Sequence, residues 1–187
     1  GLGIALAFVT AVLMDRYRFL YKSLYPILVI TQTIPTVAIA PLLVLWMGYD
    51  MAPKIALVVI VCFFPMAVGL LDGFRSADQD TVNLLRSMGA SKGQIFRLVK
   101  LPSSLGRFFS SLRVSVSYSI VGAVIAEWLG GNSGLGVYMT RVRKSYAFDK
   151  MFAVIVLISL ISLLLMWLVS MIQRLCMPYE KYGGNQS

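Results

Sequence analysis

The chain has 187 residues, of which 58% are hydrophobic and only 13% are charged, and its mean hydropathy is +0.80. Soluble domains usually carry about 25% charged residues, so a soluble fold of this length is excluded, because it could not bury so much apolar surface in one core. The net charge of +9 therefore indicates basic residues at the cytoplasmic ends of membrane helices rather than a nucleic-acid partner. Cys62 and Cys176 have no disulfide or metal-site spacing, and the chain has no histidine. We expect no metal site.

Five apolar stretches are candidate transmembrane helices, because a spanning helix needs about 20 mostly apolar residues. In chain order they cover residues 2–14, 24–47, 55–71, 105–129 and 151–173. The first stretch is short and follows Gly1 directly, so we expect that the N-terminal part of the protein is missing from this sequence. The runs are continuous rather than alternating in polarity, which favours helices over barrel strands. The predicted fold class is all-α, a polytopic transmembrane helical bundle that forms one domain over residues 1–187.

Four prolines lie in the second and third predicted spans: Pro26, Pro35, Pro41 and Pro65. Proline removes a backbone donor and kinks a helix, and membrane helices tolerate this where neighbours compensate. Simple kinking explains all four. The alternative is a kinked helix that lines a transport pathway, for which Pro35 and Pro41 are the candidates.

The lysines and arginines predict the orientation of the chain. If residues 72–107 are cytoplasmic, alternation of the spans places the C-terminus inside as well and residues 130–149 outside the cytoplasm. Twelve of the 17 basic residues then lie inside and five outside, which supports this orientation. The outer residues nevertheless remain more basic than the rule leads us to expect.

Residues 72–107, here called the polar segment, carry two successive helix-start signals. Ser76 and Gln79 have the spacing of a capping box, which predicts a helix that runs to about Met88 and ends at Gly89. Ser91 and Gln94 repeat the box. We expect this second helix to end at Pro102, so that the polar segment forms two short helices around a glycine turn.

Three interpretations of the polar segment compete. It is a solvated loop with incidental helices, a helix-turn-helix reader of DNA, or a docking element for a cytoplasmic partner. The DNA reader is the weakest of the three, because the segment lies between two membrane spans without a flanking domain.

Residues 89–102, GASKGQIFRLVKLP, resemble the EAA loop of bacterial ABC importer permeases. Gly89, Val99, Leu101 and Pro102 fit the spacing of that loop. The departures lie at the Glu-Ala-Ala positions, which are Asn83, Leu84 and Leu85 here, and at the isoleucine position, which is valine.

A second resemblance narrows the group. Residues 126–139, AEWLGGNSGLGVYM, and residues 144–149, KSYAFD, resemble the outer segment of permeases in the nitrate/sulfonate/taurine group. That group includes permeases for thiamine pyrimidine precursors and for riboflavin. Together the two resemblances cover nearly the whole chain, and the fold that they imply is that of a type I ABC importer.

The resemblance implies a permease that does no bond chemistry. Two permease subunits form the pathway in the bacterial inner membrane, an extracytoplasmic solute-binding protein delivers the solute, and a cytoplasmic ATPase dimer binds ATP and magnesium. The resemblance implies no cofactor for this chain and no nucleic-acid partner.

The resemblance also implies that the polar segment is the coupling loop, in which the helix over residues 78–88 sits in a groove of the ATPase. The docking residues implied are Asp78, Asn83, Leu84, Leu85, Arg86, Met88, Gly89, Ala90, Ser91, Val99, Leu101 and Pro102.

Two further features lie at the outer end of the fourth predicted span and in the residues that follow it. The glycine-rich stretch over residues 130–136 lacks the Gly-Lys-Ser/Thr ending of a phosphate-binding loop, so we expect a tight extracytoplasmic turn, with contact to the binding protein as an alternative. Glu127 is an acidic residue at the end of a span, and it is either a pathway or gate residue or an ordinary interfacial carboxylate beside Trp128.

Two other functions compete with the importer permease. A self-standing channel or secondary transporter would use intramembrane charges or proton relays, and apart from Glu127 no span centre has an acidic residue or a histidine. A membrane-anchored interaction protein would use the polar segment as its binding module. The transported solute does not follow from the sequence.

Overall fold

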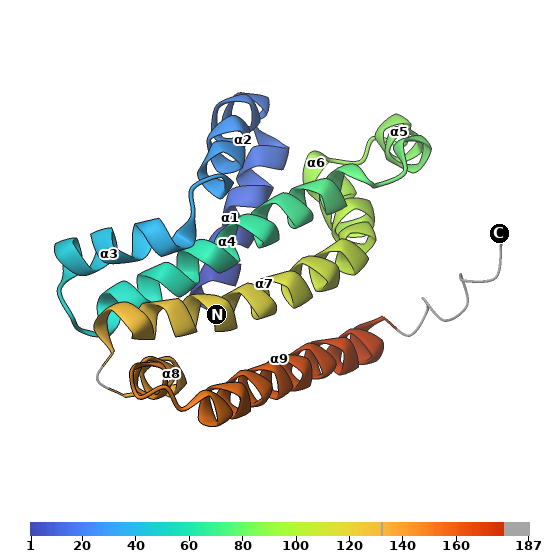
Figure 1. Ribbon diagram of the computed structural model, residues 1–187. Coiled ribbons are helices and arrows are strands. Elements are labelled where there is room, and N and C mark those ends of the chain that lie inside the picture. Colours follow the sequence, from blue (N-terminus) through green and yellow to red (C-terminus); the bar gives the residue numbers. More distant parts are fainter. Residues whose placement is uncertain (132, 178–187) are drawn as a thin grey trace.

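The computed structural model describes residues 1–131 and 133–177. The elements form a helical bundle in which α4, α7 and α9 run side by side (Figure 1). In chain order they are α1 (Leu2–Arg16), α2 (Arg18–Gln32), α3 (Thr36–Met47), α4 (Met51–Arg75), α5 (Gln79–Ser87), α6 (Lys92–Ile95), the π-helical segment η1 (Phe96–Lys100), α7 (Leu101–Gly130), α8 (Leu135–Lys144) and α9 (Phe148–Cys176). The short helices α5 and α6 lie at one end of the bundle, and α8 lies at the other (Figure 1).

Small residues bring α4 and α7 into close contact. A Cβ atom on Gly69 would lie 1.6 Å from Oγ of Ser111, and one on Gly73 would lie 2.8 Å from Cβ of Ser104. Glycines four residues apart on one helix let a facing helix approach closely, which is how helices pack in lipid. The Ser115 hydroxyl strengthens the contact by donating to the carbonyl of Cys62 at 3.0 Å. This pair of helices is the centre of the fold.

A second buried cluster joins α1 to α4. Phe74 and Met66 are fully buried, and Met14 is almost so. The Phe74 ring meets the ring of Phe8 edge-on at 6.4 Å between centroids, and the ring of Phe96 at 5.1 Å. The end of α4 is therefore fixed between α1 and the segment that follows α6.

The described helices confirm an all-α membrane fold. Three are long and apolar enough to cross a membrane: Met51–Arg75, the continuous helix Lys92–Leu129, and Phe148–Cys176. They contain the third, fourth and fifth predicted spans. The first predicted span forms α1, which has 15 residues. In α9 only Val154 and Val169 are buried, so most of this apolar helix is left for lipid or another chain to cover.

The second predicted span, residues 24–47, is not one continuous helix. It breaks into α2 and α3, which are bent by 101°. Pro35 lies at the break as the N-cap of α3, with extended backbone angles (φ −60°, ψ 125°). Proline lacks an N–H and disfavours helical geometry at the residue before it, so the helix stops at Gln32. By contrast, Pro26, Pro41 and Pro65 all lie inside helices.

The first predicted capping box is wrong. Ser76 is the C-cap of α4, and its hydroxyl donates to the carbonyl of Gly73 at 2.8 Å. The N-cap of α5 is Asp78, whose carboxylate accepts from two backbone N–H groups. Helix α4 runs on to Arg75, four residues beyond the predicted span, and this draws Ser76 into its last turn.

Pro102 does not end a helix as predicted. It lies in the first turn of α7, where a missing N–H is tolerated. The preceding segment η1 is π-helical, and the N–H of Leu101 bonds to the carbonyl of Phe96. Because η1 changes the hydrogen-bond register just before the proline, α6 continues into α7 without a stop.

Candidate functional site

A compact elbow formed by α5, the turn at Gly89 and Ala90, and α6 is the first candidate site. At its start, the Asp78 carboxylate accepts from the Thr81 hydroxyl at 2.6 Å and from the N–H groups of Thr81 and Asp80 at 3.1 and 3.3 Å. These hydrogen bonds, that of the Thr81 hydroxyl above all, hold the pKa of Asp78 below its ordinary value. An ionised carboxylate also suits the positive end of α5.

The turn of the elbow requires glycine. Gly89 has φ +82°, a conformation that side chains with a Cβ rarely adopt. Its N–H donates to the carbonyl of Arg86 at 3.1 Å, and the N–H of Ala90 donates to that of Leu85 at 2.9 Å. This pair of bonds is a Schellman motif, so Gly89 ends the helix as predicted.

The second half of the elbow begins with the predicted capping box, which is confirmed. The N–H of Ser91 donates to Oε1 of Gln94 at 2.7 Å, and the N–H of Gln94 donates to Oγ of Ser91 at 3.3 Å. Each end of the turn is therefore closed by its own hydrogen bonds, and the elbow has a defined angle.

The predicted docking residues divide between two faces of the elbow. Eight are exposed: Asp78, Asn83, Leu84, Arg86, Met88, Gly89, Ser91 and Pro102. The other four are half-buried. Leu85, Ala90 and Val99 pack against the buried cluster of Ala77, Val82 and Ile95, and Leu101 packs against the cluster around Phe74. Leu85 therefore holds the elbow together rather than facing a partner.

The outward face of the elbow is apolar although the segment is polar overall. Leu84 is 60% exposed and Met88 is 74% exposed. Leu98, which the sequence analysis did not single out for docking, is 63% exposed. Exposed apolar side chains on an amphipathic helix are typical anchors for a groove in a partner protein.

Three contacts fix the segments on either side of the elbow, the end of α4 and η1, to the membrane bundle, and no local sequence pattern predicts them. Lys100 donates to the Asp15 carboxylate at 2.6 Å, in a pair whose side chains are 24% and 12% exposed. The guanidinium of Arg75 lies 3.6 Å from the ring centre of Tyr21. With the edge-on rings of Phe74 and Phe96, these contacts connect the end of α4 and η1 to each other and to α1 and α2.

Glu127 holds the start of α8. Its Oε2 accepts from the N–H of Gly136 at 2.6 Å. A Cβ on Gly134, which has φ +127°, would lie 2.3 Å from the carboxylate, so a glycine is needed there. The turn predicted over residues 130–136 therefore leads into the start of α8, where the Glu127 carboxylate accepts a hydrogen bond from a backbone N–H of the first turn. Within residues 130–136, Asn132 lies outside the described residues.

Two cavities with several polar residues in their walls flank the α4–α7 pair, and a third, of about 420 Å³, is almost wholly apolar. The first, the α1 cavity, has a volume of about 790 Å³, and its wall includes Lys54, Cys62, Ser115, Ser119 and Glu127. The second, the break cavity, has a volume of about 330 Å³ and lies where α2 meets α3. Pro35 lines the break cavity, whereas Pro41 is an exposed residue inside α3. The two predicted pathway prolines are therefore not brought together.

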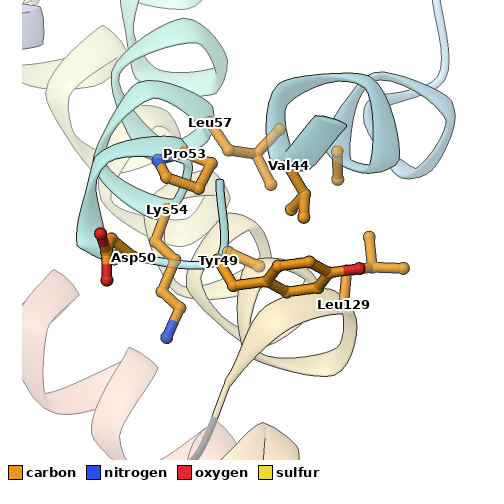
Figure 2. Close-up of a pocket in the computed structure, with 9 residues that line it drawn as sticks. Val44, Tyr49, Asp50, Pro53, Lys54, Leu57 and Leu129 are labelled. Carbon is orange, nitrogen blue, oxygen red and sulfur yellow. The ribbon is translucent and has the colours of Figure 1, made fainter. Parts of the chain in front are cut away.

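A further recess lies between the ends of α3, α4 and α7. Figure 2 shows Tyr49 and Lys54 at its mouth and Val44, Leu57 and Leu129 around it. Its volume is about 10 Å³, which holds no more than about one water molecule. This recess is too small to bind a solute.

The helical bundle, with apolar helices of spanning length and a structured polar elbow at one end, defines a multi-pass membrane protein. The chain belongs to the family of binding-protein-dependent transport system inner membrane components, whose family model matches residues 3–176.

Curated relatives of the chain are permeases of ABC transporters for small solutes. The chain is 35% identical over 185 residues to the formylaminopyrimidine transport permease protein ThiX of Halalkalibacterium halodurans, covering 97% of this chain and 74% of the relative. It is 29% identical to the riboflavin transport system permease protein RibX of Chloroflexus aurantiacus, covering 87% and 61% of the two chains. It is 31% identical to the taurine transport system permease protein TauC of Escherichia coli, covering 83% and 56%. These relatives confirm the predicted group.

Proposed function

We propose that the chain is the permease subunit of an ATP-driven importer and that the elbow couples it to a cytoplasmic ATPase. Two copies would form the pathway, an ATPase dimer would bind ATP and magnesium, and an extracytoplasmic binding protein would deliver the solute. The elbow would be cytoplasmic, within the segment over residues 72–107, and α8 would lie outside the cytoplasm within residues 130–149.

The observation that carries this proposal is the exposed apolar face of a rigid elbow. Leu84 and Met88 are exposed, and α5 lies at the end of the bundle where α9 also ends (Figure 1). A groove of the ATPase would take the two side chains as anchors, with Arg86 as a charge at the rim. The contacts that η1 and the end of α4 make beside the elbow would then pass the movement of the ATPase to the spans as a rigid-body motion.

The relatives' names divide the solutes into two chemical classes. Formylaminopyrimidine and riboflavin are planar heteroaromatic compounds, and taurine and the aliphatic sulfonates carry a sulfonate anion. The solute of this permease belongs to one of these classes. A self-standing channel is disfavoured, because a channel has no use for an apolar docking face.

Replacing Gly89 tests the coupling. A β-branched residue at a positive φ costs about 1–3 kcal/mol, so Gly89→Val should open the turn and misplace α5 relative to α6. The ATPase encoded beside this permease should co-purify with the wild type, whereas its recovery with Gly89→Val and the ATP-driven uptake should fall at least about tenfold.

Gly93→Val is the matched control. Gly93 lies in α6 without a positive φ, and the only nearby atom a Cβ would meet is Oγ of Ser91 at 3.9 Å. This variant should retain the ATPase. Equal recovery of the ATPase with both variants and the wild type would leave the elbow without a coupling role.

A further inference from the structure

The break cavity lies where the middles of three predicted spans meet. Gln32 and Thr36 flank the break in the second predicted span, Phe64 comes from the middle of α4, and Tyr118 comes from the middle of α7. Non-helical backbone at membrane depth is tolerated only where it is buried in protein or lines a water-filled cavity. Breaks of this kind also mark solute sites in other transporter folds.

Three polar side chains of the break cavity have no partner in the part of the protein that the structure describes, whereas the Thr31 hydroxyl donates to the carbonyls of its own helix. Within residues 1–131 and 133–177, no hydrogen bond is made by the Gln32 amide, the Thr36 hydroxyl or the Tyr118 hydroxyl. Gln32 is exposed, and Tyr118 is 52% exposed. Contact with lipid would leave these groups unsatisfied at a cost of several kcal/mol each. This face is therefore suited to an aqueous pathway.

The larger α1 cavity differs in charge, because Lys54 and Glu127 lie in its wall. Its other polar groups are largely engaged by the protein: Ser115 and Cys62 bond to each other's carbonyls, and Ser119 donates to the carbonyl of Val116. Glu127 itself accepts from the N–H of Gly136. The break cavity, whose described wall residues are all uncharged, is therefore the better site for an uncharged solute.

The chemistry of the break cavity is neutral and aromatic. Among its lining residues that the structure describes, none is Asp, Glu, Lys or Arg. The negative end of α2 and the positive end of α3 both point to the break, so their partial charges oppose each other. A sulfonate would find no cation there. By contrast, Phe64 and Tyr118 offer ring faces for stacking.

The Gln32 amide adds a donor and an acceptor side by side. This is the pattern with which glutamine binds an amino group next to a ring nitrogen, as in its pairing with adenine. A volume of about 330 Å³ is at the lower end of the range of about 300–1,000 Å³ found for small-molecule sites.

We propose that the break cavity is the membrane-embedded solute site, and that it takes an uncharged, planar, amino-substituted heteroaromatic ring rather than a sulfonate. This inference rests on the proposed function, because it assigns a solute to that transport pathway. Gln32 and Tyr118 would be the specificity-determining residues.

Cysteine accessibility tests the proposal in the assembled transporter. Val121→Cys, at a position that lines the break cavity but has no assigned role in recognition, and the control Leu163→Cys, at an exposed position in the middle of α9, are placed separately in a background with Cys62→Ala and Cys176→Ala. The complex with its ATPase and binding protein is reconstituted in lipid and treated with a membrane-impermeant thiol reagent. Formylaminopyrimidine and taurine, each in excess over the binding protein, are the two protecting probes.

We expect the reagent to label position 121 but not position 163. Formylaminopyrimidine should slow the labelling of position 121 at least about fivefold, and taurine should leave it unchanged. Uptake gives an independent readout: Gln32→Leu should raise the KM for formylaminopyrimidine about tenfold, as expected for one or two lost polar contacts, while the ATPase still co-purifies.

Each result that differs from these expectations would overturn a different part of the proposal. If position 121 stays unlabelled in an assembled complex, the break cavity is not in the pathway. If taurine protects as well as formylaminopyrimidine, or if neither protects, the chemical class is wrong, and an unchanged KM in Gln32→Leu removes the role of that residue. Failure of the ATPase to co-purify with the wild type would instead overturn the proposed function.

Discussion

Single side chains determine where the elbow begins and turns. Asp78 starts α5 by accepting three hydrogen bonds, and Gly89 ends it because only glycine readily takes its positive φ. Ser91 and Gln94 then close the second helix. Sequence patterns predicted Gly89 and the Ser91 box, since both depend on local spacing. The pattern misplaced the first cap, because the end of α4 competes for Ser76.

At the residue scale, Asp78 gives the elbow a defined pH dependence. A carboxylate whose pKa is lowered on folding contributes stability that is present above its unfolded pKa of about 3.9 and is lost as pH falls through the folded value. The start of α5 should therefore be insensitive to pH between about 5 and 8. Asp78→Ala should raise amide hydrogen exchange at Thr81 several-fold, whereas Asp78→Asn, also a good N-cap, should raise it less. Equal exchange in all three proteins would contradict this role of Asp78.

Packing between elements follows from small residues that bring backbones together. The α4–α7 contact depends on Gly69 and Gly73, which meet serines of α7. Apolar content predicted that these helices exist, but it did not predict their pairing, because partner choice depends on which small residues face each other in space. The apolar run over residues 24–47 likewise predicted one kinked helix rather than the two helices α2 and α3, because a proline within an apolar run is compatible with either a kink or a stop.

Between elements, the contact of Gly69 with Ser111 can be tested by enlarging one residue and then reducing the other. Gly69→Ala places a Cβ 1.6 Å from Oγ of Ser111 and 2.7 Å from its Cβ, so overpacking should destabilise the helix pair by about 1–3 kcal/mol. Ser111→Gly added to Gly69→Ala should recover most of this loss, because it removes both atoms. Thermal unfolding in detergent measures both variants. A double variant no more stable than Gly69→Ala would show that this contact does not set the helix distance.

The whole molecule combines a rigid bundle with two separate functional regions. The elbow lies at one end, and the break cavity lies near the middle of the predicted spans. Lys100 with Asp15 and Phe74 with Phe96 join η1, which follows the elbow, to α1 and α4, and α4 also lines the break cavity. Composition and motif spacing predicted the membrane fold and the elbow. The cavity requires three distant segments to converge, which no local pattern predicts.

The central claim is that the outward face of the elbow binds the ATPase. A photo-cross-linking amino acid placed at Met88, which is 74% exposed, tests this directly in membranes that contain the whole transporter, with the same group at Leu163 of α9 as the control. We predict an adduct between the permease and the ATPase from position 88 and none from position 163. No adduct from position 88 in a transporter that still imports its solute, or equal adducts from both positions, would contradict it.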